Sequence, residues 1–125
     1  MKPETGKLLE KAERALQAAE ALLREGFDDI AAGRAYYAMF HTAQAILWER
    51  GIRHRKHAGV HAAFGEHFAR TGILDPKYHR WLLDSFDERL LGDYGVDAEL
   101  DAQGVALRIE QGREFLEAAR RLLGG

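Results

Sequence analysis

Apolar residues recur at intervals of three and four along most of the chain, which is the repeat of helices with one buried face. This pattern predicts helices over residues 7–24, 28–50, 57–70 and 99–123, and another that begins near Asp75. The two prolines, Pro3 and Pro76, stand at expected helix starts, where the missing N–H group costs no hydrogen bond. Gly92 and Gly95 interrupt the pattern and should break the fourth helix. No alternating pattern persists, so we expect no strands.

Residues 30–48 differ from the other predicted helices because they are apolar nearly all round. Such a helix is buried on every side, in protein or in a membrane. Arg34 and His41 argue against a membrane, where a charged side chain costs roughly a few kcal/mol. The connections are short, so successive helices should lie antiparallel. We therefore predict an all-α, up-and-down antiparallel bundle of four main helices plus a shorter fifth, forming one domain over residues 1–125.

Composition limits the number of domains, the chemistry and the compartment that we expect for the chain. It has 125 residues, enough for one domain, and no cysteine, which excludes disulfides and thiolate chemistry. The N-terminus has no apolar signal core, so we expect a cytoplasmic protein. The net charge is −2, but residues 50–57 are basic without an acid and residues 84–101 are mostly acidic. These two poles indicate a partner, such as a second copy of the chain, or else two solvated faces.

Arg34 and His41 are the clearest candidates for chemistry, because they interrupt the apolar stretch seven residues apart. This spacing places them on nearly the same helix face, about 10 Å apart along the axis. In metal-free RNA cleavage, an imidazole exchanges protons with the 2′-hydroxyl or the leaving oxygen, and a guanidinium binds the phosphate. The alternative is structural, with Arg34 paired to a carboxylate and His41 hydrogen-bonded in the core. Tyr37 is either a nucleotide or RNA contact or a core residue.

A basic run, Arg53-His54-Arg55-Lys56-His57, leads into the predicted third helix. The unpaired N–H groups and the dipole at a helix start attract anions, and the basic side chains add positive charge. Arg53, Arg55, Lys56 and His57 are therefore candidate contacts for a nucleotide or for RNA. The alternative is a solvated loop.

His57 and His61 have the spacing of two metal ligands on one helix face. The glutamate that the zinc-protease pattern requires next to the first histidine is replaced by Ala58, however. No acidic or thiolate ligand follows at a typical interval. We therefore expect no metal and no cofactor.

Three segments carry the most distinctive combinations of residues. They are Ala-Gly-Arg-Ala-Tyr-Tyr-Ala-Met-Phe-His at residues 32–41, Lys-His-Ala-Gly-Val at residues 56–60 and Phe-Asp-Glu-Arg-Leu-Leu-Gly-Asp-Tyr at residues 86–94. Together they resemble the HEPN family, in particular its small stand-alone bacterial and archaeal branch, over roughly residues 7–123. The resemblance implies a helical bundle that usually forms a homodimer and is often encoded beside a minimal nucleotidyltransferase, as a toxin–antitoxin pair. Many members carry an Arg-x(4–6)-His motif and are RNases, whereas others are thought to bind nucleotides or RNA.

The resemblance also shows where this chain departs from the family. The family's RNase motif usually lies late in the bundle, near Arg89, and in one branch reads arginine, four residues, histidine, one residue, tyrosine. Laid on Tyr94, its arginine and histidine positions hold Asp87 and Gly92, which supply neither a phosphate ligand nor a base. Tyr94 matches a tyrosine that can accept AMP from the nucleotidyltransferase, so it is a candidate modification site.

The leading interpretation is a HEPN-type nucleotide- or RNA-binding module that forms a homodimer and acts with a nucleotidyltransferase partner in a toxin–antitoxin-like system. Its site would be a groove near the dimer axis, lined by Arg34, His41 and residues 53–57. The first alternative is a metal-free endoribonuclease that uses Arg34 and His41, which requires both side chains to reach solvent in one cleft. The second is a structural or adaptor protein without nucleotide binding.

Overall fold

The computed structural model describes residues 1–94 and 100–124, apart from the side chains of Asp93 and Tyr94. Its helices are α1 (Pro3–Arg24), α2 (Asp28–Glu49), α3 (His57–Phe64), α4 (Lys77–Tyr94) and α5 (Ala102–Leu122), and α3 continues into a π-helical turn, η1 (Gly65–Ala69). The described residues contain no strand. The predicted all-α fold of four main helices and a shorter one is confirmed, with α3 as the short helix.

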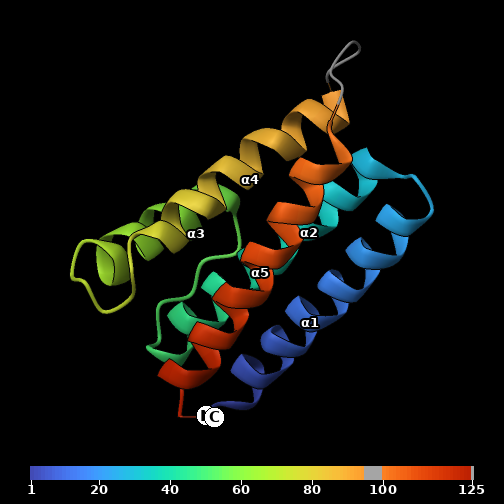
Figure 1. The fold of residues 1–125 in the computed structure, drawn as a ribbon. Coiled ribbons are helices and arrows are strands. Elements are labelled where there is room, and N and C mark those ends of the chain that lie inside the picture. The colour runs from blue at the N-terminus through green and yellow to red at the C-terminus, as the bar shows by residue number, and fades with distance from the viewer. Residues whose placement is uncertain (95–99, 125) are drawn as a thin grey trace.

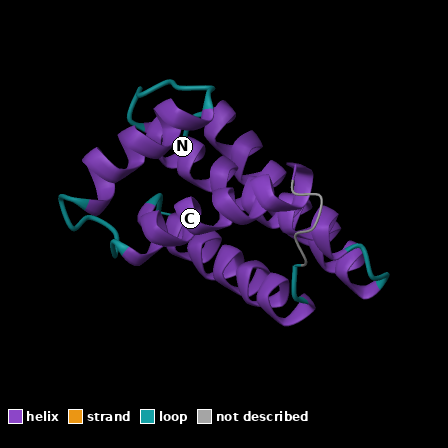
Figure 2. Cartoon of the chain, turned by 90° about the horizontal axis from the view of Figure 1, so that it is seen from above, coloured by secondary structure: helices purple, strands orange, loops and turns teal. Residues whose placement is uncertain are grey.

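α2 is the central helix of the bundle, as its apolar sequence predicted. It packs against α1, α3, α4 and α5. In Figure 1, α5 crosses in front of α2, with α1 on one side and α4 on the other. Figure 2 shows the bundle from above, with the two termini close together. Met39, Ile46 and Leu47 of α2 are almost completely buried, and burying a side chain of this size stabilises a fold by about 2 kcal/mol.

α1 begins at Pro3, earlier than the apolar repeat predicted. The backbone N–H of Lys2 and the hydroxyl of Thr5 both donate hydrogen bonds to Oε1 of Glu49, at 2.9 and 2.8 Å. These two bonds tie the start of α1 to the last residue of α2. They therefore fix the relative position of the two helices that form the site described below.

The ends of the helices follow the expected local chemistry. Gly26 and Gly51 come after α1 and α2 with φ angles of 87° and 79°, a left-handed conformation that favours glycine. α5 begins at Ala102, and the Asp101 side chain caps it by accepting a hydrogen bond of 2.9 Å from the Gln103 N–H.

α4 runs through Gly92 to Tyr94, so the prediction that Gly92 breaks this helix was wrong. A Cβ atom at Gly92 would lie 3.3 Å from the backbone oxygen of Asp29 and 3.2 Å from Cδ1 of Leu100. The glycine permits this close approach between α4 and the start of α2, and a glycine inside a helix costs only about 1 kcal/mol. Gly95 lies outside the described residues.

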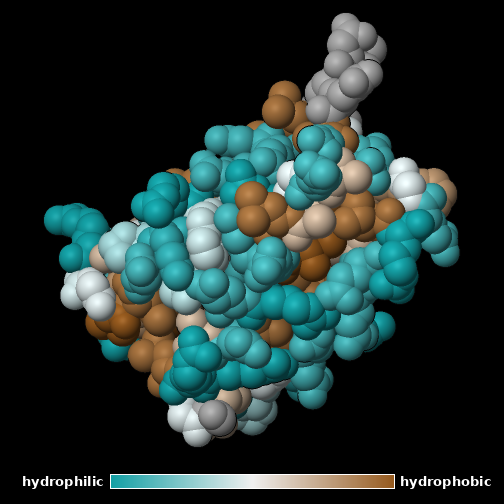
Figure 3. All heavy atoms as spheres, viewed as in Figure 1, coloured by the Kyte–Doolittle hydropathy of each residue, from teal (hydrophilic) through white to brown (hydrophobic). Residues whose placement is uncertain are grey.

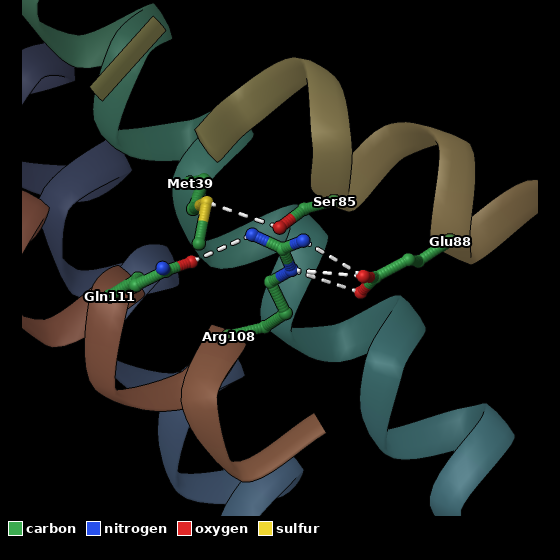
Figure 4. A network of polar contacts seen from close by, with 5 residues as sticks. All are labelled: Met39, Ser85, Glu88, Arg108 and Gln111. Atoms are coloured by element: carbon green, nitrogen blue, oxygen red, sulfur yellow. Dashed lines mark hydrogen bonds and ion pairs between the residues drawn. The ribbon is translucent and has the colours of Figure 1, made fainter. Parts of the chain in front are cut away.

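Polar contacts join α4 to α5 and to α2 (Figure 4). Arg108 of α5 donates from Nε to both carboxylate oxygens of Glu88, at 3.1 and 3.0 Å, and from Nη1 to Gln111 at 2.9 Å. In the same view, the buried Ser85 hydroxyl donates to the sulfur of Met39 at 3.4 Å. The serine therefore has a structural role between α4 and α2.

On its other side, α5 binds the carboxylates of α1. Arg113 donates from Nε to Oε1 of Glu20 at 2.6 Å and from Nη1 to Oε2 of Glu13 at 3.1 Å. Arg120 lies 3.7 Å from Oε1 of Glu13. These two acids of α1 are thus paired with bases of α5, on the side of α1 that faces α5.

The face drawn in Figure 3 is mostly hydrophilic, with apolar patches between the polar groups. The exposed large apolar side chains among the described residues are Met1, Phe27, Ile30, Ile73, Leu83, Leu91, Leu107 and Leu122. Scattered exposed apolar residues are ordinary, so they do not by themselves identify an interface. No described helix combines the length and the apolar character needed to cross a bilayer.

Candidate anion-binding groove

α1 supplies a basic stripe that the sequence analysis overlooked. Lys7, Lys11 and Arg14 are spaced four and three residues apart, so they lie along one face of the helix, and all three are exposed. Within the described part of the chain, none of them forms an ion pair with a carboxylate. The helical spacing of the three bases was the signal that could have revealed the stripe.

α2 supplies Arg34 and His41, the pair singled out from the sequence. Arg34 is exposed and His41 is partly exposed. Both line a hollow of about 400 Å³ between α1 and α2, which we call the cationic groove. Its lining residues are Lys11, Arg14, Ala15, Ala18, Arg34 and His41. No carboxylate is among them, and Arg34 and His41 share one cleft that is open to solvent.

Arg34 is held beside the groove by an aromatic ring rather than by an acid. Its guanidinium carbon lies 4.9 Å from the centre of the Tyr37 ring, and that of Arg89 lies 5.2 Å from the same ring. Such cation–π contacts contribute about 0.5–1 kcal/mol at exposed sites. No described carboxylate is paired with Arg34, so the structure does not contain the buried ion pair that was its structural alternative.

The imidazole of His41 is mainly neutral near pH 7. Burial is the main cause that lowers its pKa below the ordinary 6.5; Gln44 partly offsets this, and the charges of Lys11 and Arg34 lower it further. Its Nδ1 atom is buried and has no hydrogen-bond partner among the described residues. A neutral imidazole surrounded by cations can accept a proton from a substrate that those cations hold.

A second cavity, of about 450 Å³, adjoins the cationic groove and shares Lys11 and His41 with it. We call it the Trp48 cavity. Its other lining residues are Glu4, Lys7, Leu8, Phe40, Gln44, Trp48 and Arg55. Arg55 belongs to the predicted basic run, so the structure brings one member of that run to the same side of the bundle as His41.

The other candidates of the basic run lie apart from each other. The guanidinium of Arg53 lies over the Trp48 ring, 5.1 Å from its centre. Lys56 is exposed immediately before α3, and His57 is turned toward the core. The side chains of the basic run therefore do not all line one site.

A hydrogen-bonded group of Tyr36, His57 and His61 lies between α2 and α3. The Tyr36 hydroxyl is 2.7 Å from Nδ1 of His57 and 2.8 Å from Nε2 of His61. One hydroxyl proton cannot serve both nitrogens, so the hydroxyl donates to one ring and accepts from the other. Burial lowers the pKa of both histidines, that of His61 to about 4, and raises the pKa of Tyr36. The spacing of His57 and His61 in the sequence did not predict this role.

The described residues contain no group of three or more His, Cys, Asp or Glu side chains placed to hold a metal ion. Asp87, where the family's late motif has its arginine, is exposed on α4. α4 ends at Tyr94, but the side chain of Tyr94 lies outside the described residues, so its modification stays a prediction.

The fold and the site define a class of protein: an all-helical bundle whose first two helices enclose a groove lined by cations and free of carboxylates. Such a groove is suited to anions. Residues 5–124 match the family described as HEPN domain. The chain belongs to this family, as the segments at residues 32–41, 56–60 and 86–94 together predicted.

Similar proteins occur in bacteria and archaea. The UPF0332 protein glr0978 of Gloeobacter violaceus is 37% identical over 124 residues, which cover 98% of both chains. The protein named "Putative toxin MJ0142" of Methanocaldococcus jannaschii is 33% identical over 122 residues, which cover 98% of this chain and 83% of that protein. "Putative toxin MJ0605" of the same archaeon is 33% identical over 116 residues, which cover 93% and 86%.

Proposed function

We propose that this chain is a toxin-like HEPN protein that binds nucleotides or RNA, and that the cationic groove is its phosphate site. The observation that carries the proposal is the groove itself, where Lys11, Arg14, Arg34 and His41 meet without a carboxylate. Arginine and lysine are the usual ligands of phosphate, and arginine binds it through two parallel hydrogen bonds. The names of the two Methanocaldococcus relatives support the toxin-like role.

The overall charge of −2 does not oppose this proposal, because binding depends on the local field. The carboxylates Glu13 and Glu20 of α1 are paired with Arg113 on the side of α5, so they do not neutralise the groove. If the three permanent cations contact three phosphates of a single strand, the affinity should fall roughly fourfold for each doubling of salt.

The proposal includes the partners that the family resemblance implies. The protein forms a homodimer and acts with a minimal nucleotidyltransferase, which would meet the acidic segment of residues 84–101 or modify Tyr94. Within this proposal, residues 1–125 form one domain that works in the cytoplasm.

Fluorescence anisotropy of a short labelled single-stranded RNA tests the phosphate site. We expect Arg14→Gln and Arg34→Gln each to weaken binding about tenfold, because each loses a charge-assisted hydrogen bond to phosphate. Arg24→Gln is the matched control, since Arg24 is exposed in the last turn of α1, outside the groove. Equal affinities for the three variants and the wild type would contradict the proposal, and binding of neither RNA nor a nucleotide would favour the adaptor interpretation.

A metal-free endoribonuclease is a second candidate, favoured by one observation: Arg34 and the neutral His41 line the same open groove. In this reaction the 2′-hydroxyl gives its proton to the imidazole and its oxygen bonds to phosphorus. The bond from phosphorus to the 5′-oxygen breaks, and that oxygen takes a proton from a water molecule, which recovers one from the imidazolium. The products are a 2′,3′-cyclic phosphate and a free 5′-hydroxyl, with Arg34 stabilising the charge on the phosphate.

Cleavage of a labelled RNA pool in EDTA tests this second candidate. We expect His41→Ala and Arg34→Ala to lower the rate at least about 100-fold, as loss of a general base or an electrostatic contact does. His67→Ala is the control, because His67 lies on the surface turn η1, outside the groove. If wild-type protein binds RNA without cleaving it, the endoribonuclease is excluded and the binding protein remains.

A further inference from the structure

The Trp48 cavity differs in character from the cationic groove that it adjoins. Its lining combines apolar side chains with several cations. The apolar residues are Leu8, Phe40 and Trp48, and the cations are Lys7, Lys11 and Arg55. Glu4 is the one carboxylate in its lining. The volume of about 450 Å³ falls within the range of pockets that hold small molecules.

Two polar atoms of the cavity's residues lack partners. Among the described residues, Nδ1 of His41 and Nε1 of Trp48 are the buried side-chain nitrogens or oxygens without a hydrogen bond, and both residues line this cavity. Buried polar groups are nearly always paired, so an unpaired one points to a missing ligand or water. Because both nitrogens are shielded from solvent, a ligand in the cavity reaches them only when the neighbouring side chains shift. The indole N–H only donates, whereas Nδ1 of a neutral imidazole donates or accepts according to its tautomer.

These features together select one kind of ligand. A purely apolar molecule would leave the two nitrogens unpaired and the cations without an anion. An inorganic anion would leave the apolar wall of Leu8 and Phe40 uncovered. A flat heterocycle with hydrogen-bonding groups on its edge, joined to a phosphate, would cover the apolar wall, pair with the two nitrogens and bind the cations. Lys11 and His41 belong to both hollows, so the ring and the phosphate of one molecule can occupy adjacent sites.

We propose that the Trp48 cavity is a subsite for an unstacked nucleobase whose phosphate lies in the cationic groove. The base packs against Leu8 and Phe40. A shift of the surrounding side chains on binding exposes the two buried nitrogens, so that an acceptor on the base edge takes the hydrogen of the Trp48 indole and Nδ1 of His41 binds a second edge atom. The ligand is either a free nucleotide or one residue of a single strand, because both present the same chemistry. This inference rests on the proposed function, since it assigns a ligand to the same face of the protein.

The fluorescence of Trp48 can report on what occupies the cavity. The chain has two tryptophans, and Trp81 lies on α4 against Tyr78, outside the cavity. In a Trp81→Phe background, the fluorescence of Trp48 is followed while AMP, inorganic triphosphate, ribose 5-phosphate or a short single-stranded RNA is added. We expect AMP, RNA or both to change the emission, and the two probes without a base to leave it unchanged.

Two variants separate base binding from phosphate binding, with affinities measured by calorimetry. Leu8→Phe narrows the cavity without changing its charge and should lower the affinity for the base-containing ligand about tenfold. Trp48→Phe keeps a ring but removes the N–H donor and should lower the same affinity about threefold. Neither should change the affinity for inorganic triphosphate. Leu107→Phe, on an exposed position of α5, is the matched control for Leu8→Phe, and circular dichroism confirms that each variant is folded.

The outcomes distinguish this inference from the proposed function. RNA binding that depends on Arg34, with no effect of a base on Trp48 and none of Leu8→Phe, overturns the subsite and leaves the phosphate site. A response to AMP that Leu8→Phe weakens, without RNA binding, supports the subsite and contradicts an RNA function. A response to RNA alone identifies a strand residue as the occupant, and a response to AMP alone identifies a free nucleotide. No binding of either ligand overturns both proposals.

Discussion

His41 is the residue whose protonation depends most directly on what occupies the cationic groove. Its pKa is lowered chiefly by burial, and the charges of Lys11 and Arg34 add to this because they disfavour the imidazolium form. A phosphate in the groove would offset much of the positive charge around the imidazole. The imidazole would then be surrounded by an anion and its ligands rather than by unpaired cations.

We therefore predict that inorganic phosphate or a nucleotide raises the pKa of His41. The measurement is a pH titration of the histidine ring protons by NMR, assigned with a His41→Gln variant. Arg34→Gln should raise the same pKa in the free protein, since it removes one positive charge, and Arg24→Gln should not. A pKa of His41 that stays constant or falls when phosphate is added would contradict a phosphate site in this groove.

At the scale of residues, the groove's α2 side chains were predicted from the sequence, whereas its α1 side chains were not. Arg34 and His41 are conspicuous because they interrupt an apolar stretch. Lys11 and Arg14 alternate with acids such as Glu13 and therefore resemble any solvated helix face. Helical spacing separates Glu13 from the basic stripe, but its pairing with Arg113 depends on α5, which is distant in sequence. Tertiary contacts of this kind cannot be inferred from helical spacing.

At the scale of helices, the apolar repeat located the five α-helices, because burial of one face determines where a helix can form. It failed where a local preference competes with packing between elements. Gly92 has a low helix propensity, yet α4 continues through it, and its missing side chain permits the close approach of Asp29. The π-helical turn η1 has no signature in the repeat and was not predicted. The link from Tyr36 to His57 and His61 depends on how α3 packs on α2.

We expect Gly92→Ala to destabilise the protein by about 1 kcal/mol, although alanine favours helices more than glycine does. Its Cβ would lie 3.3 Å from a backbone oxygen that cannot move freely. Gly104→Ala is the matched control, because a Cβ there meets nothing closer than 4.0 Å, and it should stabilise α5 by up to about 1 kcal/mol. Urea unfolding measures both; equal stabilisation by the two changes would show that α4 and α2 are not in close contact.

At the scale of the whole molecule, three buried or partly buried histidines make the fold sensitive to acid. The pKa values of His41, His57 and His61 all lie below the ordinary 6.5, that of His61 at about 4. Below pH 6.5 the unfolded chain therefore binds protons that the folded chain does not bind. Stability is complete above that pH and declines as the pH falls toward 4.

For His61 alone, the loss between pH 7 and pH 5 should be about 2 kcal/mol. Thermal unfolding across this range measures it. His61→Gln, which keeps a hydrogen-bonding group near Tyr36 but does not titrate, should lower the stability at pH 7 and flatten its dependence on pH. His67→Gln, a change on the surface, should leave the slope as it is in the wild type. A slope unaffected by His61→Gln would show that this histidine does not couple folding to protonation.

The lining of the cationic groove includes the alanines Ala15 and Ala18. One nucleotide change turns any alanine codon into a valine codon, and the two added carbon atoms would narrow the hollow without altering its charge. A single mutation at either of these two uncharged positions would therefore restrict access to the groove. In a genetic selection against a harmful activity of this protein, escape variants at these alanines should accumulate as readily as variants at Arg34 or His41.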